Sequence, residues 1–235
     1  IKERPEFISF SVFKRIDWAL FGRILKKGSL LIISQMMWVL SESFTAAIYN
    51  GRGNAAVVSG MAASFSIANL FFISFDGITT ATGVLIGKSL GRNELDDARK
   101  EKTWMLSAAI IFGCIMCLVG VVTVLLVPVV FGNLSIDAQN ICRAMLLLMA
   151  LFMPLWTFVN TQLAVCRAGG DTKVGFLVDG GTTAVMIPML LILAFFTNAS
   201  PVMMYFGVKA LDVGKIIVAT HEMKKERWVV NLSNA

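Results

Sequence analysis

Long stretches without charge dominate this chain of 235 residues and limit what it can fold into. A helix of about 20 apolar residues crosses the hydrocarbon core of a bilayer, and six windows reach that length. The windows are 28–50, 55–87, 103–131, 138–166, 174–196 and 201–220. Only 15% of the residues are charged, whereas soluble domains contain about a quarter. We therefore predict an all-α integral membrane protein, a bundle of six transmembrane helices over 28–220.

Basic residues divide unequally between the two ends of these windows. If both termini lie on one side of the membrane, 17 Lys and Arg residues lie on that side and only Arg52 and Arg143 on the other. Short cytoplasmic loops collect positive residues, so we place both termini in the cytoplasm. This topology accounts for the net charge of +6. We therefore expect the lipid bilayer, and no nucleic acid, as a partner.

The segments outside the bundle complete the predicted domain organisation. Residues 1–27 are basic and rich in aromatic side chains, which is typical of a cytoplasmic linker between two domains. Part of the linker, 17–27, can form a short amphipathic helix on the membrane surface. Residues 221–235 are predicted to be a cytoplasmic tail.

A Gly-Lys-Ser sequence at 87–89 raises the question of nucleotide binding. A phosphate loop has four residues between its two glycines and follows a strand, whereas here three residues separate Gly83 from Gly87 within an apolar run. The two glycines instead continue a stripe that lies at helical spacing on one face. The other members of the stripe are Ala62, Ser66, Asn69, Asp76 and Thr80. In a bilayer such a face packs against a helix or lines a water-filled path.

The residues after this stripe predict a short cytoplasmic helix. Asn93 has the side-chain chemistry of an N-cap. Acidic residues follow it and basic residues come later, an order that matches the helix dipole. These residues are Glu94, Asp96, Asp97, Arg99, Lys100 and Lys102.

Groups suited to catalysis or metal binding are sparse. Cys114 and Cys117 have the spacing of a metal-binding pair, but no second pair accompanies them, so we interpret the cysteines as small apolar residues. His221 is the single histidine and lies where the last window meets the cytoplasm. Without a nucleophile, base and acid set we expect no enzymatic activity, no metal and no cofactor.

Four segments of the chain are informative when taken together. In chain order they are "FKRIDWALFGRILKKG", "GVLIGKSLGRNELDDARK", "CRAGGDTKVGFLVD" and "KKERWVVNLS". In this order they resemble the carboxy-terminal lobe of bacterial transporters of the multidrug and toxic compound extrusion (MATE) family. The resemblance implies one lobe of a twelve-helix antiporter that exports amphipathic organic cations, drugs among them, across the bacterial cytoplasmic membrane in exchange for H⁺ or Na⁺. It also implies a partner, which is either a missing amino-terminal lobe or a second copy of this lobe.

Ionisable side chains within the spans are candidates for the transport site, because a charge in lipid costs free energy unless it faces protein or water. Glu42 shares one face of the first span with Gln35 and Trp38. A carboxylate beside an aromatic ring suits a lipophilic cation. The alternative is that Glu42 reaches the outer surface or pairs with Arg52.

Asp76 is the second carboxylate candidate. It lies deep in the second span, with Asn69 and Thr80 on the same face, so we expect these residues to be buried and to supply oxygens to a small cation or a proton. The alternative is a buried carboxyl group that is hydrogen-bonded for structure alone.

The remaining candidates lie in the last three spans. Asn160 and Gln162 are polar neighbours in the fourth span, near Pro154, which frees a backbone carbonyl. Some members of the MATE family place a coupling aspartate on this helix and a glutamate on the first, yet here the fourth span has no acid and Gln35 stands at the position that we match to the glutamate. Asp179 is expected to bond to Lys173 or Thr172, or to serve the site. Three further charges repeat at every third residue of the last span and are expected to pair internally: Lys209, Asp212 and Lys215.

Two alternatives to an antiporter remain. A flippase of the same superfamily moves a lipid-linked or polymeric substrate and needs a more basic cavity than these acidic spans provide. A six-helix subunit without transport activity assembles with another membrane protein.

Overall fold

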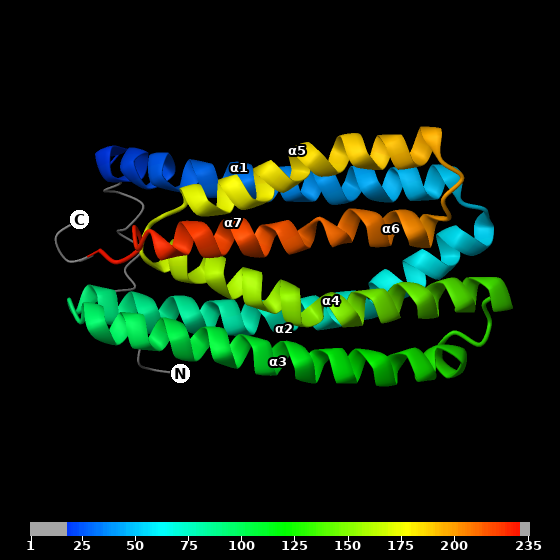
Figure 1. Cartoon of the computed structure of the whole chain (residues 1–235), viewed down its shortest axis with the longest axis horizontal. Helices are drawn as coiled ribbons and strands as arrows, with labels where there is room; N and C mark the ends of the chain where they lie inside the picture. Colours follow the sequence, from blue (N-terminus) through cyan, green and yellow to red (C-terminus); the bar gives the residue numbers. More distant parts are fainter. Residues whose placement is uncertain (1–17, 231–235) are drawn as a thin grey trace, which may run out of the picture.

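The structure is a computed structural model that describes residues 18–230, and within that range it is helical without any strand (Figure 1). This confirms the predicted all-α fold. The helices are α1 (Trp18–Arg52), α2 (Ala55–Gly91), α3 (Leu95–Val130), α4 (Ile136–Ala168), α5 (Lys173–Phe196), α6 (Pro201–Ala210) and α7 (Asp212–Lys224). The predicted linker up to residue 17 and the predicted tail beyond residue 230 lie outside the described range.

Five of the helices, α1 to α5, are long and apolar enough to cross a membrane. The sixth predicted span is made of two shorter helices, α6 and α7, which follow one another along the bundle (Figure 1). The chain tightens between them, since the amide of Leu211 donates to the carbonyl of Val208 at 3.2 Å and the amide of Gly214 to the carbonyl of Leu211 at 2.9 Å. Bonds between residues three apart are typical of a 3₁₀ turn.

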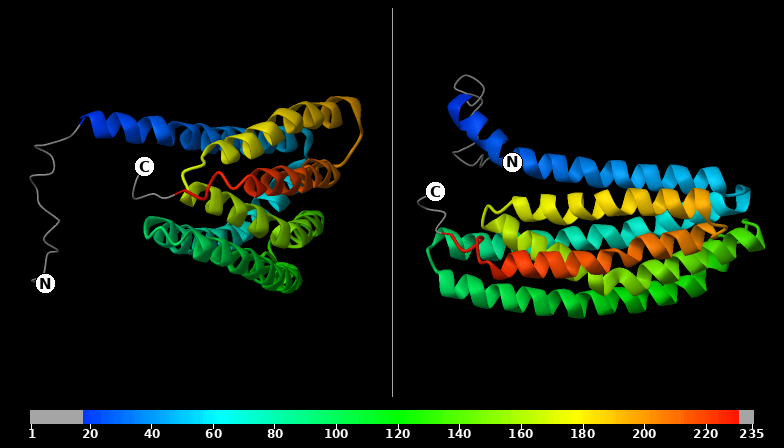
Figure 2. Two further views of the ribbon diagram at one scale, coloured as in Figure 1. Left: turned by 60° about the vertical axis from the view of Figure 1, so that its left-hand side comes forward. Right: turned by 45° about the horizontal axis from the view of Figure 1, so that its top comes forward.

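Small residues allow α3 to pack closely on α4. A Cβ atom on Gly113 would lie 2.5 Å from the Cα of Pro154, and one on Gly120 would lie 2.7 Å from the Cβ of Ala150. Two helices whose interface is lined by glycine approach closely, which is the usual way to gain dispersion contacts in lipid. Because α4 also contacts α2, α5, α6 and α7, it lies between α2 and α3 on one side and α5, α6 and α7 on the other (Figure 2).

The outer face of α3 is apolar from Ile110 to Val130. Ile111, Leu118 and Leu125 recur every seven residues, and each exposes more than three-fifths of its surface. A continuous apolar face of this size is unfavourable in water and is covered by acyl chains in a bilayer. The face therefore agrees with a helix at the edge of a membrane-embedded bundle.

Four chain segments meet at one end of the bundle, which we call the basic end. They are the start of α1, the α2–α3 turn, the α4–α5 turn and the end of α7 (Figure 1). Basic residues in or next to these segments gather there: Lys88, Arg92, Arg99, Lys100, Lys102, Arg167, Lys173, Lys224, Lys225 and Arg227. The predicted division of charge between two ends is thus present in the fold.

Two expectations at the basic end need correction. The helix after residue 93 is not a separate short element, because α3 runs without interruption from Leu95 to Val130. Asn93 does not cap it: the residue has a positive φ of 62° in the turn, and Glu94 occupies the N-cap position without a side-chain bond. The predicted acidic first turn is confirmed by Asp96 and Asp97. Residues 18–27, predicted as an interfacial helix, form the first turns of α1; their place at the membrane surface stays a prediction.

After α7 the chain folds back against the basic end. Trp228 is buried there, and its backbone lies so close to Gly169 that a Cβ on this glycine would be 1.9 Å from the Trp228 carbonyl oxygen. Lys102 places its ammonium 5.7 Å from the centre of the Trp228 ring, and Arg99 pairs with Glu226 at 2.9 Å. We call residues 225–230 the docked segment.

Candidate functional site: a line of charged side chains inside the bundle

The α6–α7 turn brings three charged side chains into the bundle. Lys209 lies in the last turn of α6, Asp212 begins α7, and Lys215 follows one turn later. Each of the three side chains is at most 18% exposed. An ionisable group at this depth needs a partner, because the hydrocarbon offers none.

Lys209 finds its partner on α1. Its Nζ atom lies 2.6 Å from Oε1 of Glu42 and donates a hydrogen bond to it. The same ammonium stands over two aromatic rings, 5.6 Å from the centre of Trp156 on α4 and 5.5 Å from the centre of Tyr205 on α6. A carboxylate and two ring faces thus surround one cation, an arrangement that favours positive charge.

The alternative in which Glu42 pairs with Arg52 is wrong. Arg52 instead closes the far end of α5, where its guanidinium donates to the carbonyl oxygens of Leu193 at 3.2 Å and Thr197 at 3.0 Å, and also to that of Ala194. The last carbonyls of a helix lack partners within the helix and attract a cation. Glu42 is therefore free to bond to Lys209.

Trp156 connects this cluster to the start of α7. Its indole Nε1 donates to Oδ2 of Asp212 at 2.8 Å, while Oδ1 of the same carboxylate lies 3.2 Å from Lys215. The predicted internal pairing of the last span is thus confirmed for Asp212 and Lys215. It is wrong for Lys209, whose ion-pair partner lies on another helix.

Asp179 ends the line of charges on α5. Its Oδ1 lies 3.9 Å from Nζ of Lys215, and its Oδ2 accepts a hydrogen bond from the hydroxyl of Ser34 on α1 at 2.9 Å. The expected bond to Lys173 or Thr172 is therefore wrong, because Asp179 lies on the face of α5 that meets α1 and α7. We call Glu42, Lys209, Asp212, Lys215 and Asp179 the charge line.

The polar residues of α4 take different roles. The side-chain amide of Asn160 donates to the backbone carbonyl of Trp156 at 2.9 Å, within its own helix. Gln162 is fully buried and donates to the hydroxyl of Thr220 on α7 at 2.8 Å, while its Oε1 has no partner among the described residues. The structure thus directs Gln162, rather than Asn160, toward α7.

The stripe on α2 faces away from the bundle. Asp76 and Asn69 are exposed, which contradicts the expectation that they are buried, because α4 packs on the opposite face of α2. Open space surrounds Gly83 and Gly87, where an added Cβ would meet nothing within 4 Å. The described residues therefore leave this stripe without a packing partner.

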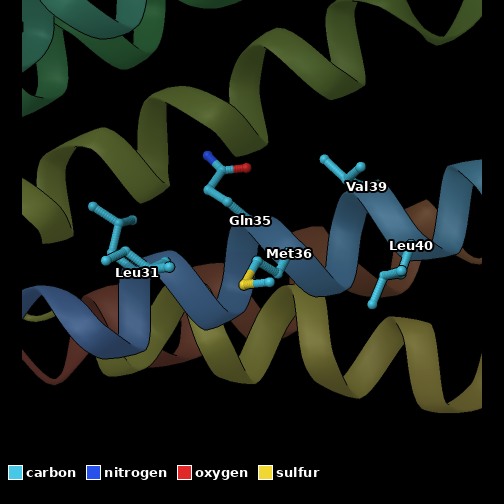
Figure 3. Close-up of a pocket in the computed structure, with 6 residues that line it drawn as sticks. Leu31, Gln35, Met36, Val39 and Leu40 are labelled. Carbon is cyan, nitrogen blue, oxygen red and sulfur yellow. The ribbon is translucent and has the colours of Figure 1, made fainter.

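Gln35 and Trp38 of α1 are also exposed. Gln35 lies with Leu31, Ile32, Met36, Val39 and Leu40 around an open, mostly apolar hollow of about 500 Å³ (Figure 3). Figure 3 shows the Gln35 amide extending from α1 on the same side as Val39. These two predicted candidates therefore do not join Glu42 in the charge line.

Three residues of the site were not selected from the sequence: Ser34, Trp156 and Tyr205. Ser34 and Tyr205 lie in apolar windows and carry no spacing that links them to a distant acid. A usable signal was the pair of lysines in the last window, because a lysine inside the membrane requires an acid and favours an aromatic neighbour.

Comparison with known proteins supplies the family. The MatE family matches residues 31–192, which covers α2, α3 and α4 and most of α1 and α5. No curated protein and no solved structure matches the chain. The match includes more than half of the sequence and agrees with the long apolar helices of the fold. The chain therefore belongs to the MatE family of multi-pass membrane transporters.

Proposed function

We propose that the chain is the carboxy-terminal lobe of an antiporter that exports organic cations across the bacterial cytoplasmic membrane in exchange for H⁺ or Na⁺. The observation that carries the proposal is the ion pair of Glu42 and Lys209 at 2.6 Å, between aromatic rings and in line with three further charges. Burying such charges costs several kcal/mol per ion, of the order known for buried pairs. Packing of small residues would hold a scaffold together without that cost.

The balance of charge within the spans supports a cationic substrate. Two lysines lie in the middle of the bundle, and both are paired with carboxylates. The carboxylates outnumber them: they are Glu42, Asp76, Asp179 and Asp212. A phosphate-bearing substrate, as a flippase moves, requires free basic groups instead. The flippase alternative therefore has less support than cation export.

The exposed stripe on α2 supports a second lobe. A carboxylate at Asp76 and an amide at Asn69 cannot face lipid without a large cost, so in the membrane they face protein or water. The small residues of the stripe that come before Asn69 and after Asp76 permit close approach of a partner. Either an amino-terminal lobe or a second copy of this lobe covers the stripe and encloses a path. Asp76 then lines that path and is a candidate for the coupling cation.

The basic end supports cytoplasmic placement of both termini through the positive-inside rule. In an alternating-access cycle, the path opens in turn to each face of the membrane. The coupling ion and the exported cation weaken each other's binding by the same factor, as linkage requires.

Efflux of ethidium from cells that express the gene tests the proposal. We expect Glu42→Gln and Asp76→Asn each to lower efflux at least tenfold while the protein still reaches the membrane. Glu94→Gln is the matched control, because Glu94 is exposed at the basic end and makes no side-chain cap bond. Full efflux in both site variants overturns the assignment of these residues. No efflux by the wild-type protein favours the non-transporting subunit.

A further inference from the structure

The surroundings of Lys209 have the chemistry of a binding site for an organic ammonium ion. The ammonium is bounded by Glu42 from α1, by the ring of Trp156 from α4 and by the ring of Tyr205 from α6. Proteins recognise alkylammonium ligands through aromatic faces and a carboxylate, because the ring quadrupole and the negative charge both stabilise a cation of low hydration. Here the cation belongs to the protein itself.

The contacts of Lys209 differ from those of a cation that only fastens helices together. Arg52 is such a fastener, since it donates to three backbone carbonyls at the end of α5. The ammonium of Lys209 has three N–H groups, yet among residues 18–230 it makes one hydrogen bond, to Glu42. The remaining stabilisation comes from the ring faces and from the charge of the carboxylate, which would stabilise another organic cation equally well.

The site is partly exposed at Glu42, and an unpaired hydroxyl group, that of Tyr49, lies in the same cluster of aromatic rings. The side chain of Glu42 is 28% exposed whereas that of Lys209 is 12% exposed, so the carboxylate can be reached without removal of the lysine from the bundle. Tyr49 packs against Tyr205 with ring centres 6.3 Å apart. The Tyr49 hydroxyl is fully buried and has no hydrogen-bond partner among residues 18–230.

The backbone next to Lys209 provides a place for movement. Lys209 is two residues before Leu211, where the bonding pattern changes from the α-helix to a 3₁₀ turn. Tight turns within a long helix are frequent at functional hinges. A change at this turn moves α6 relative to α7 and withdraws the ammonium from Glu42.

We propose that Glu42, Trp156 and Tyr205 form a binding site for an organic ammonium ion, which the side chain of Lys209 occupies when no ligand is bound. An incoming alkylammonium displaces Lys209 and pairs with Glu42, and the lysine returns when the ligand leaves. This inference rests on the proposed function for the identity of the ligand as the exported cation. The binding step itself needs no transport and can be measured on the purified protein.

Amine footprinting of the wild-type protein in lipid nanodiscs tests the displacement. The probe is tetraethylammonium, which carries no N–H group and does not consume an amine-reactive reagent. We expect tetraethylammonium to increase the labelling rate of Lys209 at least fivefold in a saturable manner. Lys215 is the matched internal control, because it pairs with Asp179 and Asp212 without an aromatic face and should not respond. Unchanged labelling of Lys209 at every concentration of the probe overturns the proposal.

The Glu42→Gln variant makes the test specific. Without the carboxylate neither Lys209 nor the probe is held, so labelling of Lys209 should be fast and independent of tetraethylammonium. A response in Glu42→Gln equal to that of the wild-type protein overturns the assigned site. Displacement without ethidium efflux would remove the transport proposal and keep the site, whereas efflux without displacement would do the reverse.

Discussion

The ammonium of Lys209 lies 2.6 Å from a carboxylate oxygen of Glu42, although 167 residues separate the two in the chain. The pair joins α1 to α6 at a depth where neither charge can be left alone. Removing one partner of a buried pair leaves the other without compensation, which is much more costly than removing both.

Replacing only one member of the Glu42–Lys209 pair by a neutral residue should therefore lower stability more than replacing both. We expect Glu42→Gln to lower the free energy of unfolding by about 3 kcal/mol, as for other broken buried pairs. The double variant Glu42→Gln with Lys209→Met should recover at least half of the loss. Both free energies of unfolding are measured from the loss of the helical circular dichroism signal as denaturant is added to the protein in detergent. A double variant less stable than Glu42→Gln alone would contradict the pairing.

The close contact of Gly169 with the Trp228 backbone predicts the effect of an alanine at position 169. A Cβ at residue 169 collides with the Trp228 backbone, so Gly169→Ala should release the docked segment. The measurement is the tryptophan emission spectrum together with the rate of proteolysis after residue 224, and we expect a red shift and faster cleavage. Gly214→Ala is the control, because a Cβ there meets nothing within 4 Å. Equal behaviour of the two variants would refute the contact.

Gly113 in the α3–α4 interface and the glycines of the α2 stripe should respond differently to replacement by alanine. Gly113→Ala places a methyl group 2.5 Å from Pro154 and should destabilise the α3–α4 interface by about 1–3 kcal/mol, as overpacking does. Gly83→Ala and Gly87→Ala have open space and should leave stability unchanged or slightly improved. If the α2 stripe contacts a second lobe, these two variants lower transport instead. Unfolding and efflux measured on the same three variants distinguish a glycine that packs within the bundle from glycines that contact a second lobe.

The docked segment should also respond to acid. The hydrogen bond from Lys225 is the largest influence on the pKa of Glu222. Together with the positive charges of Lys225, Arg227 and His221 it outweighs the opposing effect of burial and lowers this pKa below its ordinary value of 4.5. A carboxyl group with a lowered folded-state pKa stabilises the fold above pH 4.5, and this stabilisation is lost as the pH falls through the folded-state pKa. We expect proteolysis of the docked segment to increase below pH 4.5. In Glu222→Gln the acid-induced increase should be smaller; an unchanged pH profile would contradict the role of Glu222.

Most of the fold could be predicted from the sequence, because the need to satisfy backbone hydrogen bonds in lipid acts strongly on each apolar window by itself. An apolar window of sufficient length becomes a helix in lipid whatever its neighbours are, since every backbone group is satisfied within the helix. Five predicted spans therefore correspond to α1 to α5. The division of the sixth at Leu211 lies between Gly207 and Gly214, but glycines also occur inside the unbroken helices and so do not mark it. The division depends on packing around Lys209 and Asp212.

The site was less predictable because its partners come from distant positions. The need of Glu42 and Lys209 for partners could be derived from their depth, but the pairing depends on which helices are adjacent. α5 and α7 meet each other, and α1 meets α5, so Asp179 bonds to Ser34 and Lys215 rather than to the turn before it. The exposed position of Asp76 depends on the side of α2 that α4 covers, which spacing alone does not define.

Transport in reconstituted vesicles shows whether the protein exchanges an organic cation for H⁺ or Na⁺. The protein in its full natural length is placed in proteoliposomes, and ethidium movement is followed while a proton or a sodium gradient is imposed. We expect ethidium to move in the direction opposite to one of the two ions, and this movement should be lost in Glu42→Gln and retained in Glu94→Gln. Absence of ethidium movement under both gradients, with correctly inserted protein, would contradict the claim that this lobe belongs to an organic-cation antiporter.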